Sequence, residues 1–337
     1  MLTGYPKVSV IVLNYNGIKY ATKCFTSLEK QTYPNYEVIM VDNASTDDSA
    51  SYVRQHFPWV KIISNSVNMG YAKANNEAAK QVEGGYILFL NMDTWVKSNL
   101  LDVLVSEVIN DAMIGACACT QLSYDGKRRL NTGMTIDIMA YPIVPEAGEQ
   151  ILYSDGASLF VNKRFFLQLG GFDSEYFMYA EDVDLCWRML LAGYDVVSVS
   201  SAIIGHKSAG TFVLSGETYR INKLRRYLAE RNSLRSILKN YSAHNLICIL
   251  PLRFTITTFQ VMFFFLIRHP DFINAEANAI VWNLRKLKET FALRSIVQRN
   301  RRVSDRIIVR RMSKAVGVVR SFAAIQQDSL GVDWKEK

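Results

Sequence analysis

Three acidic residues stand within four positions near the middle of the chain. Glu181, Asp182 and Asp184 occur in FMYAEDVDLCWRMLLAGYDV, where they precede an apolar run that ends close to Gly193. A carboxylate at such a place can act as a general base, but acidic side chains are also common in the first turn of a helix, where the dipole stabilises negative charge. This segment alone leaves a catalytic and a structural interpretation equally open.

Polar side chains follow four successive strand-like segments, VSVIVLNYN, YEVIMVDNAS, VKIISNS and YILFLNMD. Ligands bind at the carboxyl ends of the strands in open α/β sheets, so these residues are candidates for a binding rim. Each one alone could be an ordinary turn residue, whereas four successive polar ends favour a ligand site. The residues concerned are Asn14, Tyr15, Asn16, Asp42, Asn43, Asn65, Asn68, Asn91 and Asp93.

Helix-like segments alternate with these strands, as in IKYATKCFTSLEKQ and SNLLDVLVSEVIN. Continuous apolar, β-branched runs that are each followed by ten or so helical residues predict a mostly parallel sheet covered on both faces. The expected fold class is α/β, with a doubly wound sheet. Asp125 and Gly126 predict a hairpin turn after a further strand, MIGACACTQL.

The first turn, NYNG, lacks the glycine pattern of a dinucleotide-binding loop, and the chain contains no G-x-x-x-x-G-K-[ST] element. A Gly-rich, basic first loop, as a nucleotidyltransferase would need, is also missing. If this sheet binds a nucleotide, its phosphates must be neutralised in another way. A divalent cation is the obvious means.

Composition limits the remaining classes. The chain has 337 residues, of which 49% are hydrophobic, and five cysteines without C-x-x-C spacing, a usage that favours a reducing, cytoplasmic setting. The first apolar run is too short for a signal peptide. Residues 285–320 hold twelve basic and two acidic residues, a net charge of +10, so the rest of the +8 chain has a net charge of 8 − 10 = −2. The basic character therefore belongs to the tail.

Six sequence blocks between residues 6 and 240 resemble, in order and spacing, the family 2 glycosyltransferases of the GT-A fold, and among them a rhamnosyltransferase-like group. The blocks are VSVIVLNYNG, YEVIMVDNASTDDS, NMGYAKANN, ILFLNMDT, GASLFVNKRFFLQLGGFDSEYFMYAEDVDLCWRMLLAGYDV and GHKSAGT. The resemblance implies inverting transfer of one sugar from a nucleotide-sugar donor, with a dTDP- or UDP-sugar and rhamnose favoured. It also implies a catalytic domain over 1–240, with a nucleotide-sugar half (about 1–120) and an acceptor half (about 121–240).

The resemblance also implies a site for Mn²⁺ or Mg²⁺. The family's D-x-D element corresponds to Asn91, Met92 and Asp93, so an amide replaces its first carboxylate and Asp93 is the implied metal ligand. His206 in GHKSAGT matches a second ligand. Both ions accept a site that substrate phosphates complete, so one carboxylate can suffice.

The donor and acceptor residues are implied in the same way. Asp42 resembles the acid that recognises the nucleoside, and Arg231 matches an arginine that could reach the pyrophosphate, although a solvated helix face explains it equally well. The other donor-binding candidates are Asn14, Tyr15, Asn16, Asn43, Asn68, Asn75 (or Asn76) and Asn91.

Inverting transfer needs a base that takes the proton of the acceptor hydroxyl. Asp182 matches that base, with Glu181 as an acceptor ligand, and we expect the helix dipole and a nearby metal to keep Asp182 ionised with a lowered pKa. Asp184 is expected to pair with Arg188, four residues further on. Asp155, in DGAS, matches the floor of the acceptor site less well than the small residues after it.

The segment 241–337 is expected to be helical and membrane-associating. Residues 246–267 are long enough to span a bilayer, but Pro251 and Arg253 interrupt them, which favours an in-plane or re-entrant helix over a span, with a buried interface, for instance of a homodimer, as the alternative. In SDRIIVRRMSKAVGVVR the sequence predicts an interfacial helix with one apolar and one basic face. The apolar face comprises Ile308, Met312, Ala315, Val316 and Val319, and the basic face Arg306, Arg310 and Lys314.

These tails resemble those of glycosyltransferases that use lipid-linked acceptors, which implies a polyprenyl-diphosphate-linked saccharide and an anionic membrane surface at the cytoplasmic face of the cell membrane. No nucleic-acid-binding module accompanies the basic segment, so nucleic acid is not an expected partner. The Q-x-x-R-W element and multiple spans of processive synthases are absent from the sequence, which favours a single addition. The alternative hypothesis, supported by Asn91 alone, is a non-catalytic nucleotide-sugar or membrane-binding protein.

Overall fold

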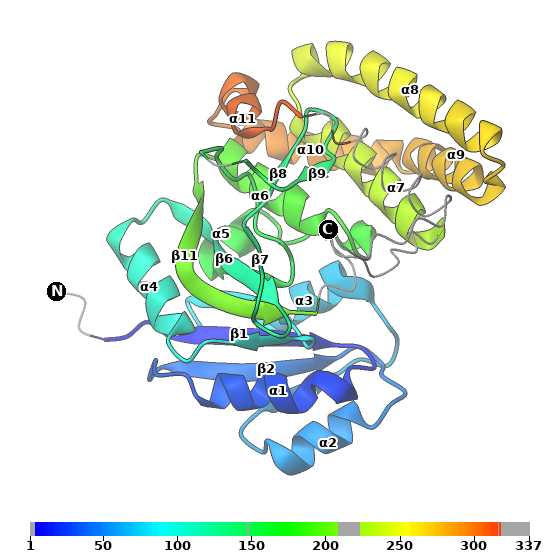
Figure 1. The fold of residues 1–337 in the computed structure, drawn as a ribbon. Coiled ribbons are helices and arrows are strands. Elements are labelled where there is room, and N and C mark those ends of the chain that lie inside the picture. Colours follow the sequence, from blue (N-terminus) through cyan, green and yellow to red (C-terminus); the bar gives the residue numbers. More distant parts are fainter. Residues whose placement is uncertain (1–3, 147, 208–222, 316, 318–337) are drawn as a thin grey trace. The chain divides into compact units, whose positions relative to one another are not determined.

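The computed structural model describes residues 4–146, 148–207, 223–315 and 317. The chain forms two compact units (Figure 1). The first comprises Met1–Met134 and Ile151–Thr211, and the second Thr135–Gln150 and Phe212–Lys337.

The first unit is an α/β layer structure. Its strands are β1 (Val8–Asn14), β2 (Tyr36–Asp42), β3 (Lys61–Ser64), β4 (Tyr86–Asn91), β5 (Thr94–Val96), β6 (Ile114–Ser123), β7 (Arg129–Thr132), β10 (Ser158–Asn162) and β11 (Asp195–His206). Its helices are α1 (Ile18–Glu29), α2 (Ser49–His56), α3 (Gly70–Gln81), α4 (Leu100–Asn110), α5 (Lys163–Gln168), the 3₁₀ helix η1 (Ser174–Tyr176) and α6 (Glu181–Leu191).

The described strands form a nine-stranded sheet in the order β3-β2-β1-β4-β10-β6-β11-β5, with β7 beside β6. Strands β1 to β4 are parallel, and their register places Asn14 opposite Asp42 and Leu13 opposite Asn91. The predicted α/β fold is confirmed, as is the hairpin between β6 and β7, but the sheet is mixed instead of mostly parallel, because β10, β5 and β7 pair antiparallel with their neighbours. The sequence pattern did not indicate that β10 is inserted antiparallel between β4 and β6.

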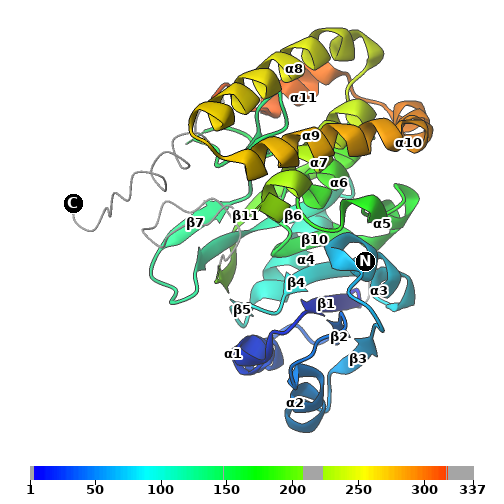
Figure 2. The same ribbon diagram turned by 90° about the vertical axis from the view of Figure 1, so that its right-hand side faces the viewer.

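Alternation along each strand divides the core between the two faces of the sheet. Val10 and Val12 belong to the cluster that also holds Phe25 of α1 and Leu104 of α4. Figures 1 and 2 show α1 and α2 together on one face of the sheet. On the opposite face, Phe89 packs its ring against aromatic residues that follow β10. The sheet is therefore covered on both sides and exposes functional residues only at its ends.

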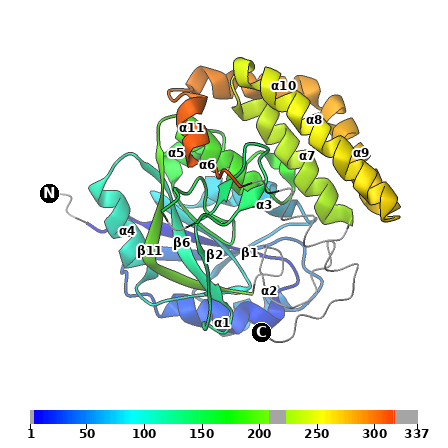
Figure 3. The same ribbon diagram turned by 45° about the horizontal axis from the view of Figure 1, so that its top comes forward.

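The second unit is mainly helical (Figure 3). Its elements are β8 (Thr135–Ile136), β9 (Pro142–Ile143), α7 (Lys223–Asn240), α8 (Ala243–Leu266), α9 (Pro270–Arg285), α10 (Leu287–Asn300) and α11 (Asp305–Arg311).

Two expectations for this unit are wrong in detail. Pro251 lies inside α8 without ending it, so the apolar helix is continuous over its 24 residues. The amphipathic helix predicted near the end of the chain stops at Arg311, and its Ile308 and Met312 are buried within the described part of the protein instead of facing outward. Val316 and Val319 lie outside the described residues.

Candidate active site

Asp93 and His206 are brought together by strand pairing. Asp93 lies in the tight connection between β4 and β5, and β5 pairs antiparallel with the end of β11 so that Thr94 faces His206. His206 Nε2 and Asp93 Oδ1 are 3.3 Å apart, and the Lys207 amide donates to the Asp93 carbonyl. The two residues implied as metal ligands thus form one cluster, although 113 positions separate them in the chain (206 − 93).

The electrostatics of this pair suit a cation. Burial alone lowers the pKa of His206, but the hydrogen bond and charge of Asp93, with a contribution from Asp155, outweigh burial and raise the pKa above 6.5. An imidazole nitrogen and a carboxylate oxygen are suitable donors for Mn²⁺ or Mg²⁺. Among the residues that the structure describes, no group of three His, Cys, Asp or Glu side chains is arranged to hold a metal. The pair therefore fits a cation whose remaining ligands come from phosphate and water.

Asn14 joins the loops that follow β1 and β2. Its side chain is fully buried, and its amide donates to Asp42 Oδ1 at 3.1 Å and to Ser49 Oγ at 2.7 Å. Its oxygen, Oδ1, accepts from the Gly17 amide. A Cβ added at Gly17 would lie only 2.5 Å from this oxygen, so the close approach requires glycine. Asn14 therefore shapes the rim from within, so that its influence on a ligand would act through these loops.

Asn16 and Asn43 organise the same rim. Asn16, with φ of 54°, accepts hydrogen bonds from the Thr46 and Asp47 amides. Asn43 donates to Asn68 Oδ1 at 2.8 Å, which links the end of β2 to the start of α3. The predicted polar residues after β1, β2 and β3 are thus one connected network.

Two other predicted residues lie differently. Tyr15 is 54% exposed and presents its ring to solvent beside the buried Asn14. Asn91 is half-buried at the end of β4, where its backbone amide donates to the Ala157 carbonyl.

A strained segment precedes the acidic helix α6. Phe177, Tyr179 and Ala180 have φ values of 59°, 69° and 63°, a backbone conformation that residues other than glycine rarely adopt. The Phe177 carbonyl accepts from the amides of Tyr71 and Ala72 at the start of α3. Strain of this kind costs about 1–3 kcal/mol for each residue and concentrates at functional sites.

Asp182 is held by the backbone of the DGAS segment. Its Oδ2 accepts from the Gly156 amide at 2.8 Å, and its Oδ1 accepts from the Val183 amide at 2.7 Å. Burial and then the negative charge of Asp155 raise the pKa of Asp182 to about 7. The expectation of a lowered pKa is wrong, because desolvation and a neighbouring carboxylate outweigh the helix terminus.

Glu181 and Asn75 are buried polar groups without hydrogen-bond partners for some atoms. Glu181 is 5% exposed and Asn75 1% exposed. Within the described ranges, Oε2 of Glu181 and both amide atoms of Asn75 have no hydrogen-bond partner in the protein. Burial, together with the charges of Asp182 and Asp155, raises the pKa of Glu181 well above its usual value. Unsatisfied buried groups of this kind can bind polar groups of a ligand.

Asp184 has the structural role that its spacing predicts. It is fully buried, and its Oδ2 accepts from Arg188 Nε at 2.9 Å. The guanidinium also donates to the carbonyl of Gly171. The expected pair between Asp184 and Arg188 is confirmed, and of the three acids this one holds α6 in place.

Asp155 has a larger electrostatic influence on the site than its sequence context indicates. Its charge acts on Asp182, Glu181 and His206, so it stands in the field of both the proposed base and the proposed metal ligands. Its Oδ1 also accepts from the Ala157 amide. The sequence signal that could have identified Asp155 is its position directly before the small residues Gly156 and Ala157 and the buried strand β10.

Arg231 lies on α7 in the second unit and is 7% exposed, so a solvated helix face is the wrong explanation for it. Its guanidinium stacks on the ring of Trp282 at 4.4 Å, and its Nε donates to Asn232 Oδ1 at 2.8 Å. A contact between Arg231 and a pyrophosphate stays a prediction.

Comparisons with known proteins show what the chain is similar to. Residues 9–168 match the family model described as Glycosyl transferase family 2. The chain is 26% identical over 210 residues to the O-antigen chain rhamnosyltransferase WbaN of Salmonella anatum, covering 60% of this chain and 66% of that protein, just under two thirds. It is 27% identical over 235 residues to the N-acetylglucosaminyl-diphospho-decaprenol L-rhamnosyltransferase of Mycobacterium tuberculosis, covering 60% of this chain and 76% of that enzyme.

A solved structure supports the fold. The mannosyltransferase PcManGT of Pyrobaculum calidifontis, in complex with GDP-Man and Mn²⁺, superimposes with a TM-score of 0.54 over 97% of this chain and 88% of its own, at 17% identity. This likeness confirms the predicted GT-A fold. Residues 9–168 therefore match glycosyl transferase family 2, and the comparisons identify the chain as an enzyme of the glycosyltransferase class.

Proposed function

We propose that the protein is an inverting, metal-dependent glycosyltransferase that moves one sugar from a nucleoside diphosphate donor to a lipid-linked or cell-surface glycan. The observation that carries the proposal is the pairing of Asp93 with His206 in a unit whose Asp182 has a pKa raised to about 7. Asp155 acts electrostatically on His206 and Asp182 alike, which supports a common site for the two groups.

Asp93 and His206 would hold the cation, and the donor's phosphates would complete its coordination. When bound, the cation supplies positive charge that stabilises the departing nucleoside diphosphate. The loops tied together by Asn14, Asn16, Asn43 and Asn68 would accommodate the nucleoside, with Asp42 at their centre. Tyr15 offers an exposed ring beside them.

Asp182 would act as the general base. The acceptor oxygen forms a bond to the anomeric carbon while the bond from that carbon to the phosphate oxygen breaks, and the hydroxyl proton moves to a carboxylate oxygen of Asp182. A base with a pKa near the working pH performs this transfer efficiently. Glu181, whose pKa burial and the charge of Asp182 raise well above its usual value, would bind the acceptor sugar through its unpaired Oε2.

The names of two relatives support a rhamnosyl donor and a lipid-linked acceptor. Both are rhamnosyltransferases, and the mycobacterial name contains a diphospho-decaprenol acceptor. We therefore place a dTDP- or UDP-linked donor, rhamnose first, and a polyprenyl-diphosphate-linked saccharide at the head of the substrates to be examined.

The helix α8 supports a place at the membrane surface. Its buried positions include Leu246 and Phe264 but also three polar residues, Arg253, Thr257 and Gln260. Arg253 pairs with Glu230, and Gln260 donates to the Tyr141 hydroxyl at 3.2 Å. Its outward positions are apolar and exposed, namely Ile247, Leu252, Phe254, Phe259, Met262, Phe265 and Leu266. A helix with polar side chains inward and apolar side chains outward suits lipid better than water. The length and composition of α8 alone are weak grounds for a span, and we propose an in-plane position at the cytoplasmic face.

The decisive experiment measures release of nucleoside diphosphate from UDP-, dTDP- and GDP-sugars in detergent, with Mn²⁺ or Mg²⁺ and with chelator. We expect one donor to be hydrolysed slowly, with metal only. Asp182→Asn should lower transfer to a lipid-linked acceptor about 10²–10⁴-fold while leaving nucleotide binding intact. Glu107→Gln, an exposed acid on α4, serves as the control.

Two outcomes would contradict the proposal. Unchanged transfer by Asp182→Asn would exclude Asp182 as the base. Absence of both turnover and metal-dependent nucleotide binding would favour a non-catalytic binding protein instead.

A further inference from the structure

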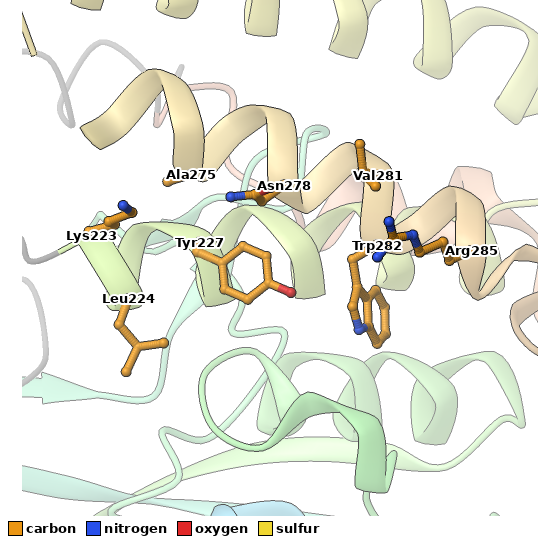
Figure 4. Close-up of a pocket in the computed structure, with 8 residues that line it drawn as sticks. All are labelled: Lys223, Leu224, Tyr227, Ala275, Asn278, Val281, Trp282 and Arg285. Carbon is orange, nitrogen blue, oxygen red and sulfur yellow. The ribbon is translucent and has the colours of Figure 1, made fainter. Parts of the chain in front are cut away.

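A cavity of about 590 Å³ lies between α7 and α9 within the second unit (Figure 4). It is open on one side, and its size is typical of sites for small ligands. The lining residues are Lys223, Leu224 and Tyr227 of α7 and Ala275, Asn278, Val281, Trp282 and Arg285 of α9. None of the eight lining residues is among those proposed to bind the metal or to act as the base.

Two aromatic rings of the cavity are fixed by stacked cations. The guanidinium of Arg231 lies 4.4 Å from the Trp282 ring centre and 5.3 Å from that of Tyr227, and Arg235 lies 5.3 Å from Trp282. Figure 4 shows the rings of Tyr227 and Trp282 projecting to the same side of the two helices. Rigid, half-buried rings offer flat surfaces against which a sugar ring can pack at little cost in side-chain entropy.

The charge of the cavity favours an anion. Its eight lining residues include Lys223 and Arg285 but no carboxylate. Lys223 has a 3.2 Å contact with Asp271, and both side chains are largely exposed, so this pair is weak. Arginine and lysine are the usual ligands of phosphate groups. The exposed amide of Asn278 adds a polar group that can bind a sugar hydroxyl.

An apolar surface adjoins these polar groups. Leu224 is 56% exposed and Val281 41% exposed in the cavity wall, and Leu284, one turn beyond it on α9, is 63% exposed. Exposed apolar side chains next to cations and aromatic rings match a ligand that joins a sugar, a phosphate group and a hydrocarbon chain. A phospholipid headgroup would use the cations but leave the two rings and the amide without a partner.

We propose that the cavity between α7 and α9 binds the diphosphate and the adjoining sugar of a polyprenyl-linked acceptor. This inference rests on the proposed function and extends it, because it assigns the membrane-linked end of the acceptor to the helical unit. The cations bind the diphosphate, Trp282 and Tyr227 pack on the sugar, and the first isoprene units lie along the apolar wall.

The test uses the full-length chain in detergent with N-acetylglucosaminyl-diphospho-farnesol as the probe. Binding is measured by calorimetry for the wild type, for Lys223→Gln/Arg285→Gln, and for Lys288→Gln/Arg299→Gln. The last pair removes two exposed cations from α10, outside the cavity, and changes the net charge equally. We expect saturable binding that weakens about tenfold in the cavity variant and less than twofold in the control.

Selectivity separates the acceptor from other ligands. Phosphatidylglycerol in the same micelles and UDP should each fail to displace the probe. Displacement by phosphatidylglycerol would identify a lipid headgroup site, and displacement by UDP would identify a nucleotide site. Equal weakening in both charge variants would indicate a non-specific electrostatic effect. Each of these results, or the absence of saturable binding, would overturn the inference.

Donor hydrolysis keeps this inference distinguishable from the proposed function. Lys223→Gln/Arg285→Gln should raise the KM for the acceptor while donor hydrolysis without acceptor stays at the wild-type rate. If the cavity variant keeps metal-dependent donor hydrolysis and its KM for the acceptor is unchanged, the cavity assignment alone is wrong. If the wild type has no transferase activity, the proposed function itself is wrong.

Discussion

Asp182 differs from an ordinary surface carboxylate in its surroundings and not in its chemistry. Burial and the charge of Asp155 raise its pKa to about 7, while two backbone amides keep its side chain in one orientation. The folded protein therefore binds a proton at this residue up to neutral pH, whereas the unfolded chain releases it near pH 3.8. Between these two values Asp182 lowers stability as the pH rises, since the unfolded state binds fewer protons. The raised pKa that suits Asp182 to act as a base therefore lowers the free energy of unfolding at neutral pH.

The first prediction concerns the pH dependence of this base. We expect kcat/KM for sugar transfer to rise with pH up to about 7 and then level off, because the ionised form of Asp182 accepts the proton. Initial rates in overlapping buffers at constant ionic strength would measure the profile. A profile that is flat from pH 5 to pH 8 would contradict the assignment of Asp182.

The second prediction concerns Asp155. Asp155→Asn removes the neighbouring charge that helps to raise the pKa of Asp182, so the acidic limb of the rate profile should move to lower pH. The same profile for Asp111→Asn, an exposed acid elsewhere in the same unit, should match the wild type. An unshifted limb in Asp155→Asn would show that burial alone sets this pKa.

At this scale the sequence identified several residues correctly. The pair of Asp184 with Arg188 follows from helical spacing, and the strand-end rule placed Asp93 at the end of β4. The sequence could not show that Asn14 is fully buried among loop hydrogen bonds, because strand ends look alike whether a side chain faces solvent or the interior. The sequence also could not show that the pKa of Asp182 is raised, because desolvation depends on packing by segments that are distant in the chain.

At the scale of elements, hydrophobic patterning predicted the parallel half of the sheet but not the antiparallel insertion of β10. Strand direction depends on long-range pairing, which local periodicity does not contain. The continuity of α8 was predicted wrongly for a related reason. Pro251 was expected to interrupt the helix, yet it is accommodated within it, and Arg253 finds a buried partner in Glu230. Tertiary contacts outweigh local propensity in both cases.

The third prediction concerns the outer face of α8. Phe259→Gln/Phe265→Gln should reduce co-flotation with anionic vesicles several-fold without lowering thermal stability, because both side chains are largely exposed in the protein itself. Ile109→Gln/Met113→Gln, which changes two exposed apolar residues of the first unit, is the matched control. Equal flotation of both variants would remove α8 as the membrane contact.

At the scale of the whole molecule, the two units divide the proposed work. One unit contains the proposed metal and base residues, and the other contains the apolar helix and the basic tail. The +10 charge of residues 285–320 would add electrostatic attraction to an anionic leaflet of about 1 kcal/mol for each cation near the surface, before screening. Association with lipid should therefore weaken as salt is raised, while the apolar contribution remains.

The fourth prediction concerns ligand binding by the intact protein. Asp93 and His206 alone would supply only two ligands to the proposed metal, so a nucleoside diphosphate and Mn²⁺ together should raise the melting temperature more than the sum of their separate effects. Asp93→Asn should remove this synergy, which differential scanning fluorimetry in detergent would detect. A full shift with the nucleotide alone would contradict metal-dependent donor binding.

The polar interior of α8 has a consequence for how the protein tolerates substitution. In a helix packed onto a soluble core, the apolar positions are the sensitive ones and the polar positions vary freely. Here the tolerant positions should be Ile247, Phe259 and Phe265, exchangeable for other aliphatic or aromatic residues, while Arg253 and Gln260 resist replacement. A saturation library across α8 would then show, at these positions, a substitution pattern opposite to that of a soluble amphipathic helix, whereas the buried Leu246 and Phe264 should require apolar residues in the ordinary way.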